Sequence, residues 1–372
     1  MKKIGIMTHH KFYNAGTMLQ AYALQKKIEM MGEEAEIINY TTETYRRTTK
    51  EKIFSILKNP YIIIEKITKK YEKKANKNKI ELTTKAFDEF HKKIKTSKEC
   101  FKTEQELQKN CTGYDIYMTG SDQTWNPYIP SNQEAYLLNF APKDKIRVSY
   151  APSIGGNNIP EKSKELFKTS LANFKNISCR EKIGKEILEN ISNKKVELVL
   201  DPTFLLDKEQ WNSISKEVSV DKKYLLCYFL GRNKQNITKA NKIAKDKNLK
   251  IVSIYTMDGG KTAKSNLKFG IGPSEFLYLI NNAECVCTDS FHGVAFSSIF
   301  NKDFYAFKKR KDNNKSDNNR LIDLLDRLNL EDRLISNDTN IEYSSIDYMK
   351  VNEKLKQEKK KSEEYLAKCI NS

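Results

Sequence analysis

The spacing of apolar and polar positions predicts alternating strands and helices from the first residues onward. Lys3–Thr8 is an apolar run of strand length, Thr17–Met31 repeats apolar residues at helical spacing, and Ala35–Asn39 is a second strand. Gly32 follows the helix at a position where glycine commonly ends one. A strand, a helix and a second strand in this order predict the opening of a parallel α/β sheet.

The same alternation resumes after an interruption. Residues 45–108 are lysine-rich and helical in pattern, so we expect an insertion that carries one or more helices. Apolar runs then predict strands at Ile116–Thr119, Val148–Ala151, Asn176–Cys179, Glu197–Leu200, Tyr224–Leu230, Lys250–Tyr255 and Ala283–Thr288. Helical spacing is found at Asn236–Asp246, Ser274–Asn282 and Val294–Phe300. Strands that alternate with helices predict the α/β class throughout.

The chain is long enough for two domains. Its 372 residues exceed the length at which one hydrophobic core usually divides. Asp201-Pro202-Thr203 ends a predicted strand, and we place the end of the first domain near residue 205. We therefore expect an N-terminal Rossmann-like domain at 1–205 and a C-terminal one at 206–340, facing each other across a cleft. The polar, helical tail at 341–372 is expected to pack back on the first domain.

The net charge of +18 adds an expectation about partners. The excess of 66 Lys and Arg over 48 Asp and Glu lies in short lysine runs, without the motif of a nucleic-acid-binding fold, so no nucleic-acid partner is expected. The positive balance favours anionic small substrates and peripheral contact with an anionic membrane. No apolar run approaches the roughly 18–20 residues that cross a bilayer. The apolar start ends at Thr8, too early for a signal peptide, so we expect a cytoplasmic protein that can contact the inner face of the membrane.

The seven cysteines are spaced irregularly and form no C-x-x-C motif. Free cysteine behaves as a small buried hydrophobe, so structural thiols are expected in place of metal ligands. The sequence predicts no metal and no cofactor.

Two loops that follow predicted strands carry polar residues suited to a ligand. In the first, Asn14-Ala15-Gly16 precedes a helix and would let backbone amides approach an anion, although a plain turn needs the same residue types. In the second, Asp122 and Gln123 can bond sugar hydroxyls, and Trp125 offers a face on which a pyranose could stack. The alternative for this second loop is an Asx-turn, with Trp125 filling a core.

Arg180 and His292 also follow predicted strands. A guanidinium at a helix start suits bidentate capture of a carboxylate or phosphate, although a surface pair with Glu181 is the alternative. His292 is one of only four histidines, with His9, His10 and His91, and it lies between a buried strand and an apolar helix. A lone histidine is often structural, but this position favours a functional site.

An ordered set of short motifs resembles the polysaccharide pyruvyl transferase family from about residue 3 to about residue 335. The motifs are Ile4-Gly5-Ile6, Asn14-x-Gly16-x-x-Leu19-Gln20-x-Tyr22-Ala23-Leu24, Gly120-Ser121-Asp122-Gln123-x-Trp125-Asn126, Ser149-Tyr150-Ala151-Pro152-Ser153, Arg180-Glu181-Lys182, Asp201-Pro202-Thr203 and Asp289-Ser290-Phe291-His292-Gly293. The resemblance implies a two-domain fold similar to GT-B glycosyltransferases, with phosphoenolpyruvate as the donor. It also implies that a cyclic pyruvate ketal forms on a sugar of a cell-surface polysaccharide, such as a capsule or exopolysaccharide, or of its lipid-linked precursor.

Ketal formation requires protonation of the methylene carbon of the donor, and cations to hold a trianion. Together with the resemblance, this chemistry implies catalytic roles for His292, Asp289 and Asp122. Donor contacts are expected from Arg180, Ser290, Gly293, Asn14 and Gly16, and acceptor contacts from Gln123, Trp125 and Asn126. Some family members carry an Arg–Leu–His triplet where this chain has Ser290-Phe291-His292, and Lys308, Lys309 or Arg310 could supply the charge instead.

Two other functions fit the same sequence. A GT-B-type glycosyltransferase that uses a nucleotide sugar would share the fold and the cleft. A non-catalytic protein that binds glycans or nucleic acid through its positive charge would show salt-dependent binding that does not depend on His292.

Overall fold

The computed structural model describes residues 1–41, 76–129, 133–221, 223–231, 233–257, 266–309, 318–336 and 343–372. The predicted insertion at 45–108 therefore lies partly outside the described residues, and Arg310 lies outside them altogether.

The first sheet contains four parallel strands in the order β2-β1-β3-β4. They are β1 (Lys3–Met7), β2 (Glu34–Ile37), β3 (Ile116–Thr119) and β4 (Ile146–Ser149). Helix α1 (Ala15–Met30) connects β1 to β2 and begins where the side chain of Asn14 accepts a hydrogen bond from the backbone N–H of Thr17. Two short parallel strands, β5 (Ile177–Cys179) and β6 (Val196–Leu198), form a further small sheet beside β4.

The second sheet contains six parallel strands in the order β12-β11-β10-β7-β8-β9. They are β7 (Tyr224–Tyr228), β8 (Lys250–Ile254), β9 (Leu267–Lys268), β10 (Cys285–Thr288), β11 (Asp303–Phe307) and β12 (Leu334–Ile335). Its helices are α10 (Lys234–Asp246), α11 (Pro273–Asn281), α12 (Phe291–Ile299) and α13 (Asn319–Arg327). The predicted α/β class, with two Rossmann-like parallel sheets, is confirmed.

The remaining helices cover the outside of the two sheets. Those of the N-terminal half are α4 (Lys77–His91), α5 (Glu104–Asn110), α6 (Gln133–Tyr136), α7 (Glu161–Ala172) and α8 (Lys182–Ser192). A 3-10 turn at Pro202–Leu205 and helix α9 (Lys208–Asn212) carry the chain from the first sheet toward the second, and a second 3-10 turn at Glu331–Arg333 precedes β12.

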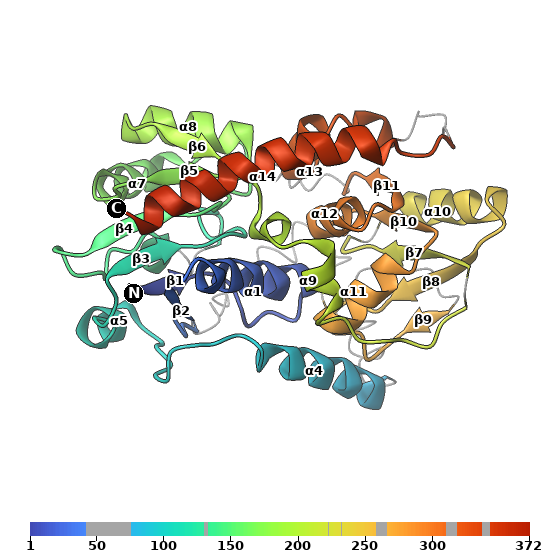
Figure 1. Cartoon of the computed structure of the whole chain (residues 1–372), viewed down its shortest axis with the longest axis horizontal. Helices are drawn as coiled ribbons and strands as arrows, with labels where there is room; N and C mark the ends of the chain where they lie inside the picture. The colour runs from blue at the N-terminus through green and yellow to red at the C-terminus, as the bar shows by residue number, and fades with distance from the viewer. Residues whose placement is uncertain are drawn as a thin grey trace, which may run out of the picture.

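One apolar core extends from the first sheet to the second (Figure 1). It includes Ile4 of β1, Leu24 of α1 and Val286 of β10, none of which is exposed. Trp211 of α9 is also buried and packs edge-on against Phe296 of α12, with ring centroids 5.0 Å apart. Burial of apolar area is the main stabilising term in folding, so this shared core holds the two sheets in a defined relative position.

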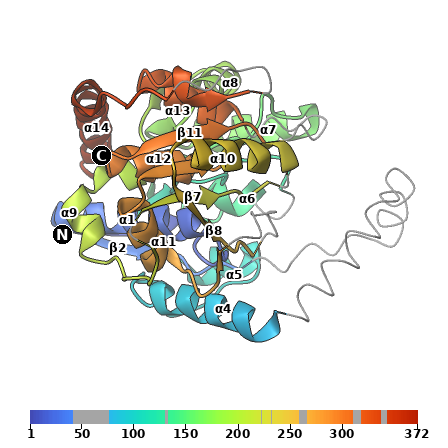
Figure 2. The same ribbon diagram turned by 90° about the vertical axis from the view of Figure 1, so that its right-hand side faces the viewer.

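The C-terminal helix α14 (Tyr348–Ile370) runs along both halves of the molecule (Figure 1). Near its start, the hydroxyl of Tyr348 donates to the backbone oxygen of Ser297, which belongs to α12 of the second half. Near its end, the hydroxyl of Tyr365 donates to the backbone oxygen of Ser149 in β4, at 2.9 Å. In Figure 1, α14 lies along the upper edge of the molecule and α4 along the lower edge. In the turned view of Figure 2, α14 lies at the upper left and α4 at the bottom.

Two findings bear on the expectations about membranes and thiols. Within the described ranges, no helix has the length and apolarity needed to cross a bilayer. All seven cysteines fall inside these ranges and are free thiols, and only Cys100 is exposed. The expectation of structural thiols agrees with the burial of the other six.

Candidate active site

The first turns of two helices meet between the sheets. Helix α1 follows β1 and helix α12 follows β10, so both helices begin at the carboxyl end of a strand. A Cβ atom added to Gly16 would overlap the imidazole ring of His292, so the ring lies directly against the backbone of Gly16. Helix N-termini carry partial positive charge, and the two that meet here favour an anion between them.

The residues around His292 build a tight strand-to-helix turn. Ser290 is the N-cap of α12, and its hydroxyl oxygen accepts a hydrogen bond from the N–H of Gly293 at 3.4 Å. A Cβ at Gly293 would overlap the side chain of Thr288, so only glycine fits at this position. The structure therefore gives Ser290 and Gly293 a clear role in shaping the helix start at His292.

Arg180 lies at the centre of a buried ionic network. One terminal nitrogen, Nη1, is 2.6 Å from the Oδ2 atom of Asp201, and the other, Nη2, is 3.6 Å from the Oδ1 atom of Asp122. The ring of Phe291 covers the guanidinium at 4.5 Å, and the side chain of Arg180 has no exposed surface. Nε of Arg180 also lies 3.9 Å from Oε2 of Glu181, but both side chains are buried, so the predicted position of this pair at the surface is wrong. The prediction that Arg180 faces an open anion site is corrected too, because carboxylates and Phe291 enclose it.

Asp201 is the residue that sequence reasoning missed most clearly. Its Oδ2 atom accepts hydrogen bonds from Ser121 Oγ and Arg180 Nη1, and it lies 3.7 Å from Nε2 of His292. Burial raises the pKa of the Asp201 carboxyl, but His292 and Arg180 outweigh burial and hold the pKa well below the ordinary aspartate value. The available signal was the motif Asp201-Pro202-Thr203 at a strand end, although the spacing did not connect it to His292.

Asp122 forms a second carboxylate site on the other side of Arg180. Its backbone has a φ of 73°, in the left-handed region, and its Oδ2 atom accepts a hydrogen bond from Thr17 Oγ1 at 2.7 Å. The Nδ1 atom of His9 is 3.8 Å from the same oxygen. Burial raises the pKa of Asp122, but His9 and Arg180 lower it by more than burial raises it, so the carboxyl remains ionised. His9 was noted in the sequence only as one of four histidines.

Asp289 does not serve as the carboxylate partner of His292. Its oxygens accept hydrogen bonds from the backbone N–H groups of Leu230 at 2.7 Å and Gly231 at 2.9 Å. Burial raises the pKa of this carboxyl, although Lys309 and the two amides oppose burial. In the structure Asp289 shapes the loop after β7, because backbone amides there donate to both of its oxygens. Its predicted catalytic role stays a prediction.

Trp125 does not offer its face to a sugar. The side chain is 1% exposed, its Nε1 atom donates to the backbone oxygen of Tyr136, and its ring packs edge-on against Phe174. The alternative in which Trp125 fills a core is confirmed. Asn126 is also buried, and its Nδ2 atom donates to Gln123 Oε1 at 2.6 Å, so Asn126 orients Gln123.

A cleft of about 570 Å³ opens beside this network. It is lined by His9, Lys11, Phe12, Tyr13, Asn14, Thr17, Asp122, Gln123, Ile129 and Met257. Phe12 and Tyr13 are 57% and 39% exposed, which is unusual for aromatic side chains and typical of a binding surface. Asn14, Asp122 and Gln123 of the predicted set thus line the same cleft.

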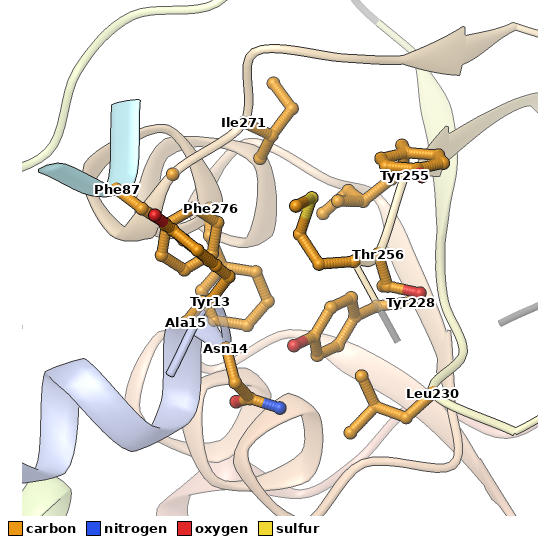
Figure 3. Close-up of a pocket in the computed structure, with 13 residues that line it drawn as sticks. Tyr13, Asn14, Ala15, Phe87, Tyr228, Leu230, Tyr255, Thr256, Ile271 and Phe276 are labelled. Atoms are coloured by element: carbon orange, nitrogen blue, oxygen red, sulfur yellow. The ribbon is translucent and has the colours of Figure 1, made fainter. Parts of the chain in front are cut away.

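A small pouch adjoins the cleft on the side of the second sheet (Figure 3). Its volume is about 20 Å³, and it shares Tyr13, Asn14 and Met257 with the larger cleft. Within the part of the chain that the structure describes, no group of three or more His, Cys, Asp or Glu side chains is arranged to hold a metal ion.

Comparisons with known proteins give a family and several distant structural likenesses. A family model described as polysaccharide pyruvyl transferase matches residues 14–308. No curated protein matches the sequence.

Solved structures resemble the chain over most of its length. UDP-GlcNAc 2-epimerase from Methanocaldococcus jannaschii is 12% identical with a TM-score of 0.47, over 96% of this chain and 92% of that one. UDP-N-acetylglucosamine 2-epimerase from Rickettsia bellii is 9% identical with a TM-score of 0.47, over 99% and 96%. An alpha-glucosyltransferase in complex with UDP and DNA is 11% identical with a TM-score of 0.47, over 98% and 95%. At these values, the structural likenesses support no inference about activity.

Proposed function

The chain belongs to the polysaccharide pyruvyl transferase family and is a transferase, and from this premise we propose that it moves the pyruvyl group of phosphoenolpyruvate onto a sugar. The acceptor belongs to a cell-surface polysaccharide or its lipid-linked precursor, and the product is a cyclic ketal. The observation that carries the proposal is the meeting of two helix N-termini at Gly16 and His292. Nε2 of His292 is buried and lies 3.7 Å from Oδ2 of Asp201, a separation longer than a hydrogen bond.

The donor anion is proposed to lie between these two helix starts. Phosphoenolpyruvate carries a carboxylate and a phosphate, which the positive ends of α1 and α12 can both attract. Lys11 at the rim of the cleft adds a full positive charge, and its Nζ atom is held at 2.9 Å by Thr41 Oγ1. These groups can neutralise the donor without a metal ion. Arg180 stabilises Asp122 and Asp201 from behind and is proposed to act through them.

The first chemical step is proton transfer to carbon. We assign His292 as the acid that gives its proton to the methylene carbon of the donor, which becomes a methyl group. Asp201, 3.7 Å from Nε2, orients the ring and stabilises its protonated form, as a buried carboxylate does in many acid–base pairs. The carbon that bears the phosphate then acquires oxocarbenium character, and the nearby carboxylates stabilise this positive charge.

The remaining steps join the sugar and release phosphate. One sugar hydroxyl attacks the oxocarbenium carbon and gives its proton to His9, which lines the cleft beside the ionised Asp122. The carbon–oxygen bond to phosphate then breaks and the phosphate leaves with the bonding electrons. A second hydroxyl attacks the oxocarbenium carbon that phosphate departure leaves, gives its proton to the neutral imidazole of His292 and closes the ketal ring. The departing phosphate takes the proton held by His9. Asp122 is too weak a base to take the first proton directly, because its pKa is held well below the ordinary value.

The proposal is tested by incubating the protein with phosphoenolpyruvate and a panel of sugar glycosides. Release of inorganic phosphate together with the mass increase of a ketal is the expected result. His292→Gln should lower kcat by about 100-fold or more, the usual scale of a lost acid–base residue. His91→Gln is the matched control, because His91 stacks on His10 and is absent from the lining of the cleft. Release of a nucleoside diphosphate from a nucleotide sugar, with no phosphate from phosphoenolpyruvate, would overturn the proposal.

A further inference from the structure

The small pouch beside the cleft has the size and polarity of a site for one methyl group. A volume of about 20 Å³ is close to the space of a single water-sized group. Seven of its thirteen lining residues have apolar side chains: Ala15, Phe87, Leu230, Ile254, Met257, Ile271 and Phe276. Tyr13, Asn14, Tyr228, Tyr255, Thr256 and Gly272 complete the wall. Against the apolar part of this wall, a water molecule would lose hydrogen bonds. A methyl group has no such loss and gains burial.

The opening of the pouch carries an amide donor. The Oδ1 atom of Asn14 caps α1 by accepting the N–H of Thr17 at 3.3 Å, so the Nδ2 atom must point away from the helix. Figure 3 shows the amide of Asn14 directed into the same space as the side chains of Leu230 and Tyr228. A methyl group in the pouch would therefore place an attached carbonyl oxygen within the reach of an N–H donor.

The pouch opens into the larger cleft at Tyr13, Asn14 and Met257. There the exposed ring of Tyr13 is held edge-on by Phe87, with centroids 5.7 Å apart, and can pack against a sugar ring. Polar groups that bond hydroxyls, such as Gln123, line the same cleft. A sugar ring in the cleft can therefore direct one substituent into the pouch.

We propose that the acceptor is an N-acetylated amino sugar whose acetyl methyl group occupies the pouch and whose acetyl carbonyl accepts a hydrogen bond from Asn14 Nδ2. The identification of this ligand as the acceptor rests on the proposed function. A 6-deoxy sugar also carries a methyl group, but it has no carbonyl oxygen to meet the amide. The acetamido group satisfies both the apolar wall and the polar opening.

The experiment measures binding without the donor, by ligand-observed saturation-transfer NMR. The probes are the methyl glycosides of N-acetylglucosamine, N-acetylmannosamine and N-acetylgalactosamine, each compared with its parent hexose glycoside. We expect at least one N-acetyl glycoside to bind about tenfold or more tightly than its parent, the scale expected for one well-fitted small group. Its acetyl methyl protons should receive the strongest saturation.

Two variants and one control locate this contact. Leu230→Phe adds volume to the wall of the pouch and should abolish the acetyl preference, while the backbone N–H of residue 230 still reaches Asp289. Asn14→Asp keeps an equally good helix cap but removes the Nδ2 donor, so the preference should fall without unfolding of α1. Leu82→Phe makes the same substitution at a 55% exposed position on α4 and should retain the wild-type preference.

The outcomes separate this proposal from the function on which it rests. Equal binding of N-acetyl and parent glycosides, or an acetyl preference that Leu230→Phe leaves unchanged, would refute the pouch assignment even if phosphate is released from phosphoenolpyruvate. Strongest saturation at the methyl group of a 6-deoxy glycoside would refute it as well. A third outcome is that the acetyl saturation disappears in Leu230→Phe while the wild-type protein releases no phosphate from phosphoenolpyruvate. That result would support the pouch as an acetyl site and refute the proposed reaction.

Discussion

Gly16 has a hydrogen atom in place of a side chain, and this allows the first turn of α1 to contact His292 of α12. Gly16 belongs to the first turn of α1, and the ring of His292 fills the space where a Cβ would lie. Alanine is normally better than glycine in a helix by about 1 kcal/mol. The sign of the Gly16→Ala effect therefore reports whether this contact exists in solution.

We predict that Gly16→Ala lowers the free energy of unfolding by about 1–3 kcal/mol, because an added methyl group in a packed site forces its neighbours apart. It should also reduce kcat/KM about 100-fold, because the acid would be displaced from the donor. Urea unfolding and the phosphate-release assay measure the two effects. Gly113→Ala is the control, since a Cβ there meets nothing within 4 Å. A stabilised, fully active Gly16→Ala protein would show that the helix starts do not meet.

Two aspartates show what residue-level reasoning could and could not reach. Asp201 and Asp289 both follow strands within short motifs, and sequence reasoning chose Asp289, which lies three residues before His292. The structure brings Asp201 to 3.7 Å from the ring and turns Asp289 toward the amides of Leu230 and Gly231. The side chain that reaches a histidine depends on the paths of both chains, which residue type and local spacing do not encode.

At the scale of elements, α14 joins parts of the fold that are distant in sequence. The backbone N–H of Leu200 donates to Ser362 Oγ at 2.9 Å, and Arg327 of α13 forms an ion pair with Glu358. Leu366 has no exposed surface and belongs to the core that both sheets share. The helix is thus part of the folded core.

We predict that Leu366→Ala lowers the free energy of unfolding by about 3 kcal/mol, the usual cost of a cavity left by a buried leucine. Lys360→Ala, on the solvent side of the same helix with a side chain 79% exposed, should change stability by less than about 0.5 kcal/mol. Urea unfolding followed by circular dichroism measures both. Equal effects of the two substitutions would contradict the packing of α14 described above.

Nine of the twelve described strands were predicted, whereas β9, β11 and β12 were missed. The ends of the predicted strands were less accurate, for a physical reason. Tyr224–Leu230 is one continuous apolar run, yet β7 ends at Tyr228. Phe229 is buried in the loop after the strand, and Leu230 donates its N–H to Asp289. Apolar patterning reports burial, whereas the end of a strand is set by its hydrogen-bond partners, and one of these lies in another segment.

At the scale of the whole molecule, stability should depend on pH through His10. Its ring is buried, its Nδ1 atom donates to the backbone oxygen of Thr8 at 3.1 Å, and it stacks on His91. The pKa of His10 is lowered from the ordinary value of 6.5 to about 4, mainly by burial. The hydrogen bond with Thr8 opposes burial, whereas neighbouring His91, Lys11 and His9 lower the pKa too. Between these two pH values the unfolded chain binds a proton that the folded protein does not.

We therefore predict that stability is lost as the pH falls from about 6.5 to about 4, by up to about 3 kcal/mol from His10 alone. His10→Asn, which keeps an N–H donor for Thr8, should remove this part of the pH dependence. Unfolding free energies in urea at pH 7 and pH 4.5 give the comparison, and the difference between wild type and variant isolates His10 from other titrating groups. Identical pH profiles for the two proteins would contradict the burial of a neutral His10.

The sequence by itself determined the α/β class, the two parallel sheets and the loops from which the site is built. These follow from local periodicity and from the rule that ligands lie at the carboxyl ends of parallel strands, so they need no knowledge of distant contacts. Only the tertiary structure decided which polar groups meet. It enclosed Arg180, buried Trp125, and brought His9 and Asp201 into the site. The physical reason is that a contact between residues far apart in the chain depends on how the two sheets pack, and local sequence does not specify that packing.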